Sequence, residues 1–184
     1  MNTIELMIKE HEYILRMLKL LRLASAQVMK GQDINYEDFD KMIDFVANYA
    51  DKHHHGKEEK YLFHQMINEL GKIGSNLVTN GMLVEHDFGR LFMSELRLAL
   101  EKAKSGDEES RLDIIANAVG YANHLERHIS KENQVVFTFA AKALKAETLA
   151  IVDEQSEAFE AEAEANGIQN HYIALLEDLE KKYL

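Results

Sequence analysis

Apolar residues recur at intervals of three and four along almost the whole chain, and this periodicity constrains the fold more than any other feature of the sequence. Such spacing places the apolar side chains on one stripe of an α-helix. The breaks between the periodic segments carry glycine or helix-capping residues. The chain contains no proline, and no segment shows the alternation typical of a strand. We therefore expect an all-α protein.

Four long periodic segments precede a shorter amphipathic one. The long helices are expected over about residues 3–30, 36–70, 77–103 and 111–144. Because short connections force neighbouring helices to run antiparallel, they predict an up-and-down antiparallel four-helix bundle over residues 1–144. Residues 145–184 are expected to form a C-terminal helical extension packed on the same domain, with an interruption near Asn166 and Gly167.

Composition excludes several classes of function. The chain has 184 residues, enough for one domain with a single core, and the absence of cysteine excludes disulfides, thiolate metal sites and iron–sulfur clusters. A formal net charge of −11 argues against nucleic acid or an anionic membrane as partner. Charges interrupt the N-terminal segment every few residues, so it is neither a signal peptide nor a membrane span, and we expect a cytoplasmic protein.

Histidine and glutamate occupy positions on the apolar stripes where core residues are expected. These residues are His11, His54, Glu58, His86, His124, His128 and Glu132. His54 and Glu58 are four residues apart, as are His128 and Glu132, so each pair lies one turn apart on one helix face. A lone histidine in such a phase is usually a core residue with a hydrogen-bond partner. Buried unpaired carboxylates cost several kcal/mol each, however, so their convergence with imidazoles in one core favours metal ions.

The set of ligands indicates the kind of metal. Imidazole and carboxylate without sulfur suit iron, manganese or zinc, and a pair of bridging carboxylates suits a dinuclear centre. The side chains are too many for one tetrahedral zinc. We expect two non-haem iron ions that share both glutamates, with five histidines and one open coordination position, although other divalent metals could be present in isolated protein.

Four short motifs lie in order, one in each predicted helix: "KEHEYI", "HHHGKEEKYLF", "LVEHDFGR" and "HLERHISKENQVVF". Through them the sequence resembles the hemerythrin-like (HHE cation-binding) family. The resemblance implies a four-helix bundle around a non-haem di-iron site. His11, His54, His86 and His128 resemble the histidine ligands of the family, and Glu58 and Glu132 resemble its bridging carboxylates.

Two departures from the oxygen-carrying members concern the third and fourth helices. Those members have H-x-x-x-H on the third helix, whereas Met82 stands four residues before His86. They have H-x-x-x-x-D on the fourth helix, whereas His128 is followed four residues later by Glu132. The H-x-x-x-E pattern on two helices is closer to the branch that includes di-iron proteins linked to nitric oxide and iron-centre repair.

The fifth histidine ligand has more than one candidate. We expect His124, because it lies one turn before His128 on the core face. His55, about 100° around the helix from His54, is the main alternative, with His53 behind it. Tyr121, a turn further along from His124, either packs in the core or hydrogen-bonds a bound ligand.

Three functions fit these residues. The first is a protein that binds a small diatomic ligand or oxidant, such as dioxygen, nitric oxide or peroxide, at the open iron position. The second is a redox enzyme that reduces nitric oxide or peroxide or repairs iron centres, and this would require a redox partner. The third is an iron or oxygen sensor or store. The sequence does not separate them, and it does not indicate the oligomeric state.

Overall fold

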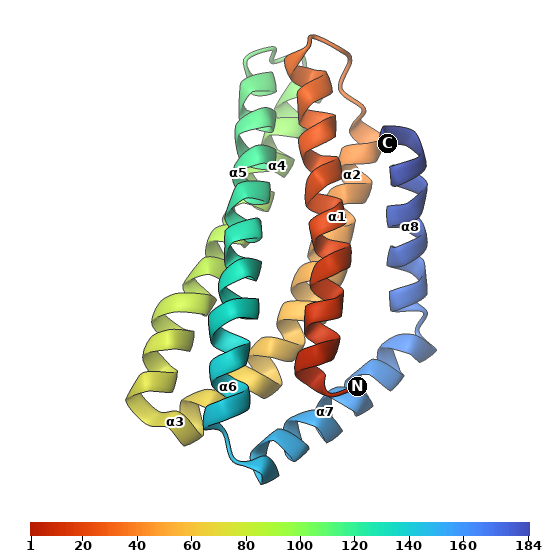
Figure 1. Cartoon of the computed structure of the whole chain (residues 1–184). Coiled ribbons are helices and arrows are strands. Elements are labelled where there is room, and N and C mark those ends of the chain that lie inside the picture. The colour runs from red at the N-terminus through yellow and green to blue at the C-terminus, as the bar shows by residue number, and fades with distance from the viewer.

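The computed structural model describes all 184 residues and contains helices only. Four helical rods run up and down in antiparallel order, as the periodicity predicts (Figure 1). The first rod is α1 (Thr3–Met29). The second consists of α2 (Tyr36–Phe45), the π-helical segments η1 (Val46–His55) and η2 (Glu58–Phe63), and the first half of α3 (His64–Leu77). The third rod consists of the rest of α3, η3 (Val78–Met82) and α4 (Leu83–Lys104). The fourth rod consists of α5 (Ser110–Lys131), η4 (Glu132–Val136) and α6 (Phe137–Ala143).

Local sequence determines where the rods begin and turn. The Asn2 side chain accepts a hydrogen bond from the Glu5 backbone N–H at 2.9 Å, and the Glu5 carboxylate accepts one from the Asn2 N–H at 3.2 Å. This reciprocal pair caps α1. The chain reverses within α3 at Gly71, whose φ of 55° and ψ of −130° lie outside the helical region and suit a residue without a β-carbon. The second and third rods therefore meet within α3 (Figure 1).

The C-terminal extension contains two helices. α7 (Ala146–Ala165) crosses the end of the bundle near the N-terminus, and α8 (Ile168–Tyr183) runs beside α1 and α2 (Figure 1). The break between them falls at Gly167, with φ of 71°, where the sequence predicts an interruption. Arg16 of α1 donates two hydrogen bonds, of 2.9 and 2.6 Å, to Glu180 of α8. None of these helices is both long enough and apolar enough to cross a membrane.

The buried apolar side chains form two clusters with a polar layer between them. The larger cluster includes Ile14 and Leu125, and the smaller includes Met7 and Phe137. His11 lies between Met7 and Ile14 on α1 and is 1% exposed. The other rods likewise bury histidine or glutamate between the two clusters. The bundle therefore encloses a layer of charged and imidazole groups within an apolar interior.

The rods depart from α-helical geometry next to this layer. Segments η1, η2 and η4 have π-helical hydrogen bonding, which is rare and often occurs at functional sites. A π turn contains more residues than an α turn, so side chains leave the 3.6-residue phase. His53, His54 and His55 are consecutive, yet all three are buried.

Candidate metal centre

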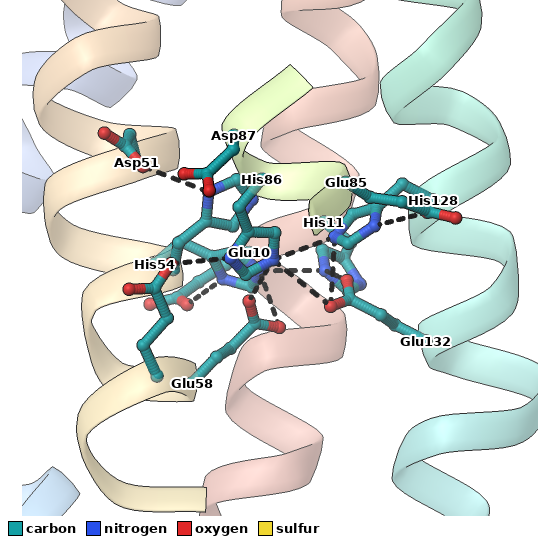
Figure 2. Close-up of polar contacts among 12 residues, drawn as sticks. Glu10, His11, Asp51, His54, Glu58, Glu85, His86, Asp87, His128 and Glu132 are labelled. Atoms are coloured by element: carbon teal, nitrogen blue, oxygen red, sulfur yellow. Dashed lines mark hydrogen bonds and ion pairs between the residues drawn. The ribbon is translucent and has the colours of Figure 1, made fainter. Parts of the chain in front are cut away.

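The polar layer contains two neighbouring groups of ligand atoms, each with its atoms within 4.8 Å of one another. The first group consists of His11, His54, Glu58 and Glu132. The second consists of His55, His86 and His128. Figure 2 shows side chains from all four rods meeting in this region. The structure thus brings together six of the seven side chains that the sequence indicates, and adds His55.

The two glutamates lie between the groups. Each carboxylate directs one oxygen toward an imidazole of the first group and the other oxygen toward the second group (Figure 2). The carboxylate oxygens of Glu58 lie 3.3 Å from His54 Nε2 and 3.6 Å from His86 Nε2. Those of Glu132 lie 3.3 Å from His11 Nε2 and 3.1 Å from His128 Nε2. This is the arrangement that two carboxylates need in order to bridge two cations.

The oxygens of Glu58 and Glu132 are the strongest test of whether metal fits here. Both residues are 0% exposed, and none of their four carboxylate oxygens has a hydrogen-bond partner. Only neighbouring imidazoles can compensate these charges in the metal-free protein, and a buried carboxylate that is not compensated costs several kcal/mol. Cations held between the carboxylates and the surrounding imidazoles would remove that cost, and a set of nitrogen and oxygen donors without sulfur suits iron. The residues present therefore fit a pair of metal ions.

Imidazole nitrogens also converge within each group. The Nε2 atoms of His11 and His54 are 2.8 Å apart, and those of His86 and His128 are 3.1 Å apart. At such a distance two ring nitrogens share a single proton, or they face a common cation. His55 stacks on His86, with ring centroids 3.8 Å apart and planes inclined by 7°.

A second layer of side chains orients the five imidazoles. Each Nδ1 has an oxygen partner on a neighbouring side chain, and this leaves Nε2 directed at the centre. The partners are Asn133 for His11 at 2.8 Å, Glu10 for His54 at 2.7 Å, Asp51 for His55 at 3.3 Å, Glu59 for His86 at 2.7 Å and Glu85 for His128 at 2.9 Å. An Nδ1–H donated to a carboxylate or amide oxygen fixes the tautomer whose Nε2 lone pair can bind metal. None of these partners was indicated by the sequence pattern.

His124 lies outside both groups, although the sequence predicts it as the fifth histidine. Its Nε2 is 2.7 Å from the backbone carbonyl oxygen of Glu85, to which it donates. Its ring lies beside Phe92, with centroids 5.9 Å apart. The nitrogen that would bind metal is thus engaged by α4, and His55 takes the place in the second group that was expected for His124.

Without metal, protonated imidazoles balance the carboxylates. Burial disfavours the charged form of His54, but the charge of Glu58 and hydrogen bonds to carboxylates outweigh burial and raise the pKa of His54 to about 10. Burial is likewise outweighed at His86, where hydrogen bonds to carboxylates raise the pKa to about 9. Burial and neighbouring imidazolium charges hold the pKa of His55 well below its ordinary value. Metal binding would therefore displace protons from this centre.

A third acidic group adjoins the centre but contains its own cation. The ammonium of Lys57, which is 0% exposed, bonds to the carboxylates of Glu10 and Glu160 and lies 3.4 Å from His53 Nε2. The second oxygen of Glu10 accepts the hydrogen bond from His54. This ion-pair network therefore connects α7 to the centre. The only sequence signal for it is the spacing of Lys57, four residues after His53.

The fold and the centre define a class: a helical-bundle protein with a buried histidine and carboxylate site for metal. The comparison with protein families specifies the class further. The family described as the hemerythrin HHE cation binding domain matches residues 2–140. The chain therefore belongs to the hemerythrin HHE cation-binding domain family. No curated protein and no solved structure gives a significant match to it.

Proposed function

We propose that the chain holds two non-haem iron ions bridged by Glu58 and Glu132, and that this centre binds a small diatomic ligand or oxidant. Dioxygen, nitric oxide and peroxide are the candidates. The observation that carries the proposal is the set of four unpartnered carboxylate oxygens between two imidazole groups in a fully buried layer. Membership of a cation-binding family supports it.

The two groups of side chains suggest how the ligands divide. His11 and His54 would hold one ion, and His55, His86 and His128 the other, with both glutamates shared. We propose His55 as the fifth imidazole in place of His124. Iron bound there would supply the redox and ligand-binding chemistry. The protein supplies the orientation of the imidazoles through their Nδ1 partners, and two apolar clusters that limit water in the layer.

Anaerobic loading with ferrous iron, followed by metal analysis and optical spectra with dioxygen and with nitric oxide, tests this function. We expect two irons per chain and a spectrum that changes when either gas is added. Glu12→Ala is a matched control for Glu58→Ala, because Glu12 is an exposed glutamate outside the centre. The dinuclear assignment would be contradicted if Glu12→Ala lost iron while Glu58→Ala kept it. Saturation of the wild-type chain with one metal would also contradict it.

The same experiment separates ligand binding from redox catalysis. A stable and reversible oxygen complex would support ligand binding. Rapid oxidation by dioxygen, with turnover of nitric oxide or peroxide, would assign the centre to the redox enzymes. We expect rapid oxidation, because Met82 takes the place of one histidine of the oxygen carriers and is packed in the smaller apolar cluster.

A further inference from the structure

A carboxylate from outside the four rods reaches the surroundings of the candidate centre. It belongs to Glu160 of α7, whose side chain is 20% exposed. One of its oxygens bonds to the Lys57 ammonium and lies 3.2 Å from His53 Nε2. The other oxygen accepts a hydrogen bond of 2.9 Å from the side chain of Gln169 on α8. Both helices of the C-terminal extension therefore fix the position of this carboxylate.

Two side chains connect Glu160 to a candidate metal ligand. The Lys57 ammonium bonds to Glu160 and to one oxygen of Glu10. The other oxygen of Glu10 accepts the hydrogen bond from His54 Nδ1 at 2.7 Å. Lys57 and Glu10 are 0% and 4% exposed, so little water screens the charges between them. The charge of Glu160 therefore acts on His54 without contact between the two residues.

The cation beside Glu10 differs from the cations beside the other carboxylates that orient imidazoles. Those carboxylates are paired with Arg90 or Lys131, whose side chains are 41% and 52% exposed. Lys57 is fully buried, and of these three cations it alone bonds to a carboxylate of the C-terminal extension. Because water screens the exposed pairs, the pairing of Lys57 is the one that most affects an imidazole.

Stability alone explains this network poorly. Burying an ammonium and a carboxylate is costly, and apolar residues of similar size often give equal or greater stability. The network also leaves two carboxylates sharing one ammonium. Its place beside His54 instead indicates an effect on the candidate centre.

The shared ammonium determines how strongly Glu10 accepts the hydrogen bond from His54. An ammonium held by Glu10 alone would neutralise most of its charge and weaken it as an acceptor. Because Glu160 takes part of the hydrogen bonding of the ammonium, Glu10 keeps more negative charge. A stronger acceptor at Nδ1 makes Nε2 more basic and raises its affinity for metal, most of all for an ion of higher charge.

We propose that Glu160 is a positioning residue of the metal centre, through which the C-terminal extension sets the affinity and the redox potential of the ion at His54. Glu160 acts by sharing the Lys57 ammonium with Glu10. The proposal rests on the proposed function, because it requires metal at His54. It adds control of that metal by a helix outside the four rods.

The first test is the midpoint potential of the iron-loaded protein. Glu160→Gln leaves the ammonium charge to Glu10 and should raise the potential. Direct partners of ligating histidines are worth about 10- to 100-fold in metal affinity, so a residue that acts through two side chains should lower the ratio of ferric to ferrous affinity by about three- to tenfold. Glu164→Gln is the matched control, because Glu164 is exposed one turn further along α7, and it should leave the potential unchanged.

Lys57→Met separates this effect from a loss of structure. Without the ammonium, Glu10 becomes the stronger acceptor, and the potential should fall below that of wild type. A network with only a structural role would move both variants in the same direction, because each variant removes a contact between α7 and the bundle. If Lys57→Met does not fold, Glu160→Gln and its control still test the proposal.

The resonance of the His54 Nδ1 proton in the metal-free protein is a second readout, measured by NMR with isotope-labelled histidine. A weaker hydrogen bond to Glu10 should shift this resonance upfield in Glu160→Gln, and a stronger one should shift it downfield in Lys57→Met. Glu164→Gln should leave it in place.

Iron content distinguishes failure of this proposal from failure of the proposed function. If wild-type protein holds fewer than two irons, the proposed function fails, and the NMR comparison still tests the action of Glu160 on His54. If wild-type protein holds two irons and Glu160→Gln changes neither the potential nor the resonance, the proposed function stands and this proposal is overturned. Shifts of Glu160→Gln and Lys57→Met in the same direction would also overturn it.

Discussion

Removing the metal should make the stability of the fold depend on pH between about 7 and 10. In the metal-free protein the pKa of His54 is raised to about 10 and that of His86 to about 9, from 6.5 in each case. Above pH 6.5 the unfolded chain loses these protons while the folded chain keeps them. The stabilisation is therefore complete below that pH and is lost as the pH rises through 9 and then 10.

The magnitude follows from these pKa values. One unit of pKa corresponds to about 1.4 kcal/mol, so each imidazolium alone would stabilise the folded state by a few kcal/mol. Both imidazolium ions interact with the carboxylate of Glu58, so their contributions are not additive. We expect the free energy of unfolding to fall by roughly 3 to 5 kcal/mol between pH 7 and pH 10. A loss of this size is a large part of the stability of a typical domain.

Urea unfolding at intervals of one pH unit, with a chelator present, measures this dependence. Glu58→Gln removes one of the charges that hold the proton on His54, so it should flatten the slope. Metal-loaded protein should show little slope over the same range, because a nitrogen bound to metal carries no proton. A free energy of unfolding that stays constant or rises in metal-free wild-type protein would refute the reasoning.

Three further outcomes are expected. Glu58→Ala or Glu132→Ala should lower the occupancy of both irons together in metal analysis, and loss of only one iron would argue against bridging. His55→Leu should reduce iron content or shift the optical bands of the oxidised centre, whereas His124→Leu should leave both unchanged; the reverse result would restore His124 as the ligand. Lys57→Met leaves the buried Glu10 and the partly exposed Glu160 without their cation and should destabilise the fold by about 3 kcal/mol in urea unfolding. A change below about 1 kcal/mol would mean that the network contributes little.

The fold was predictable because apolar residues recur with the same helical period along the chain. The 3.6-residue spacing of apolar residues identifies the four rods, and the glycines at 71 and 167 mark where helices break. The existence of a metal centre was predictable for a similar reason. Glu58 and Glu132 each follow a histidine by four residues on a core stripe. Packing in an apolar core does not account for carboxylates at such positions.

The placement of His55 beside His86 and His128 was not predictable from helical phase, because it depends on a departure from the period that the prediction uses. His55 reaches the second group from a π-helical segment, whereas an ideal α-helix would turn it about 100° away from His54. The partners of the imidazoles were missed for another reason. Glu10 and Glu85 are single acidic residues on helices rich in charge, and only the packing of the rods brings them to Nδ1 atoms.

The most direct test of a carboxylate-bridged pair of irons is anomalous diffraction at the iron edge from crystals of anaerobically loaded protein. Two anomalous peaks should lie between the carboxylates of Glu58 and Glu132, with His55 beside one of them and His124 beside neither. A single peak, or two peaks that do not share both glutamates, would contradict the account.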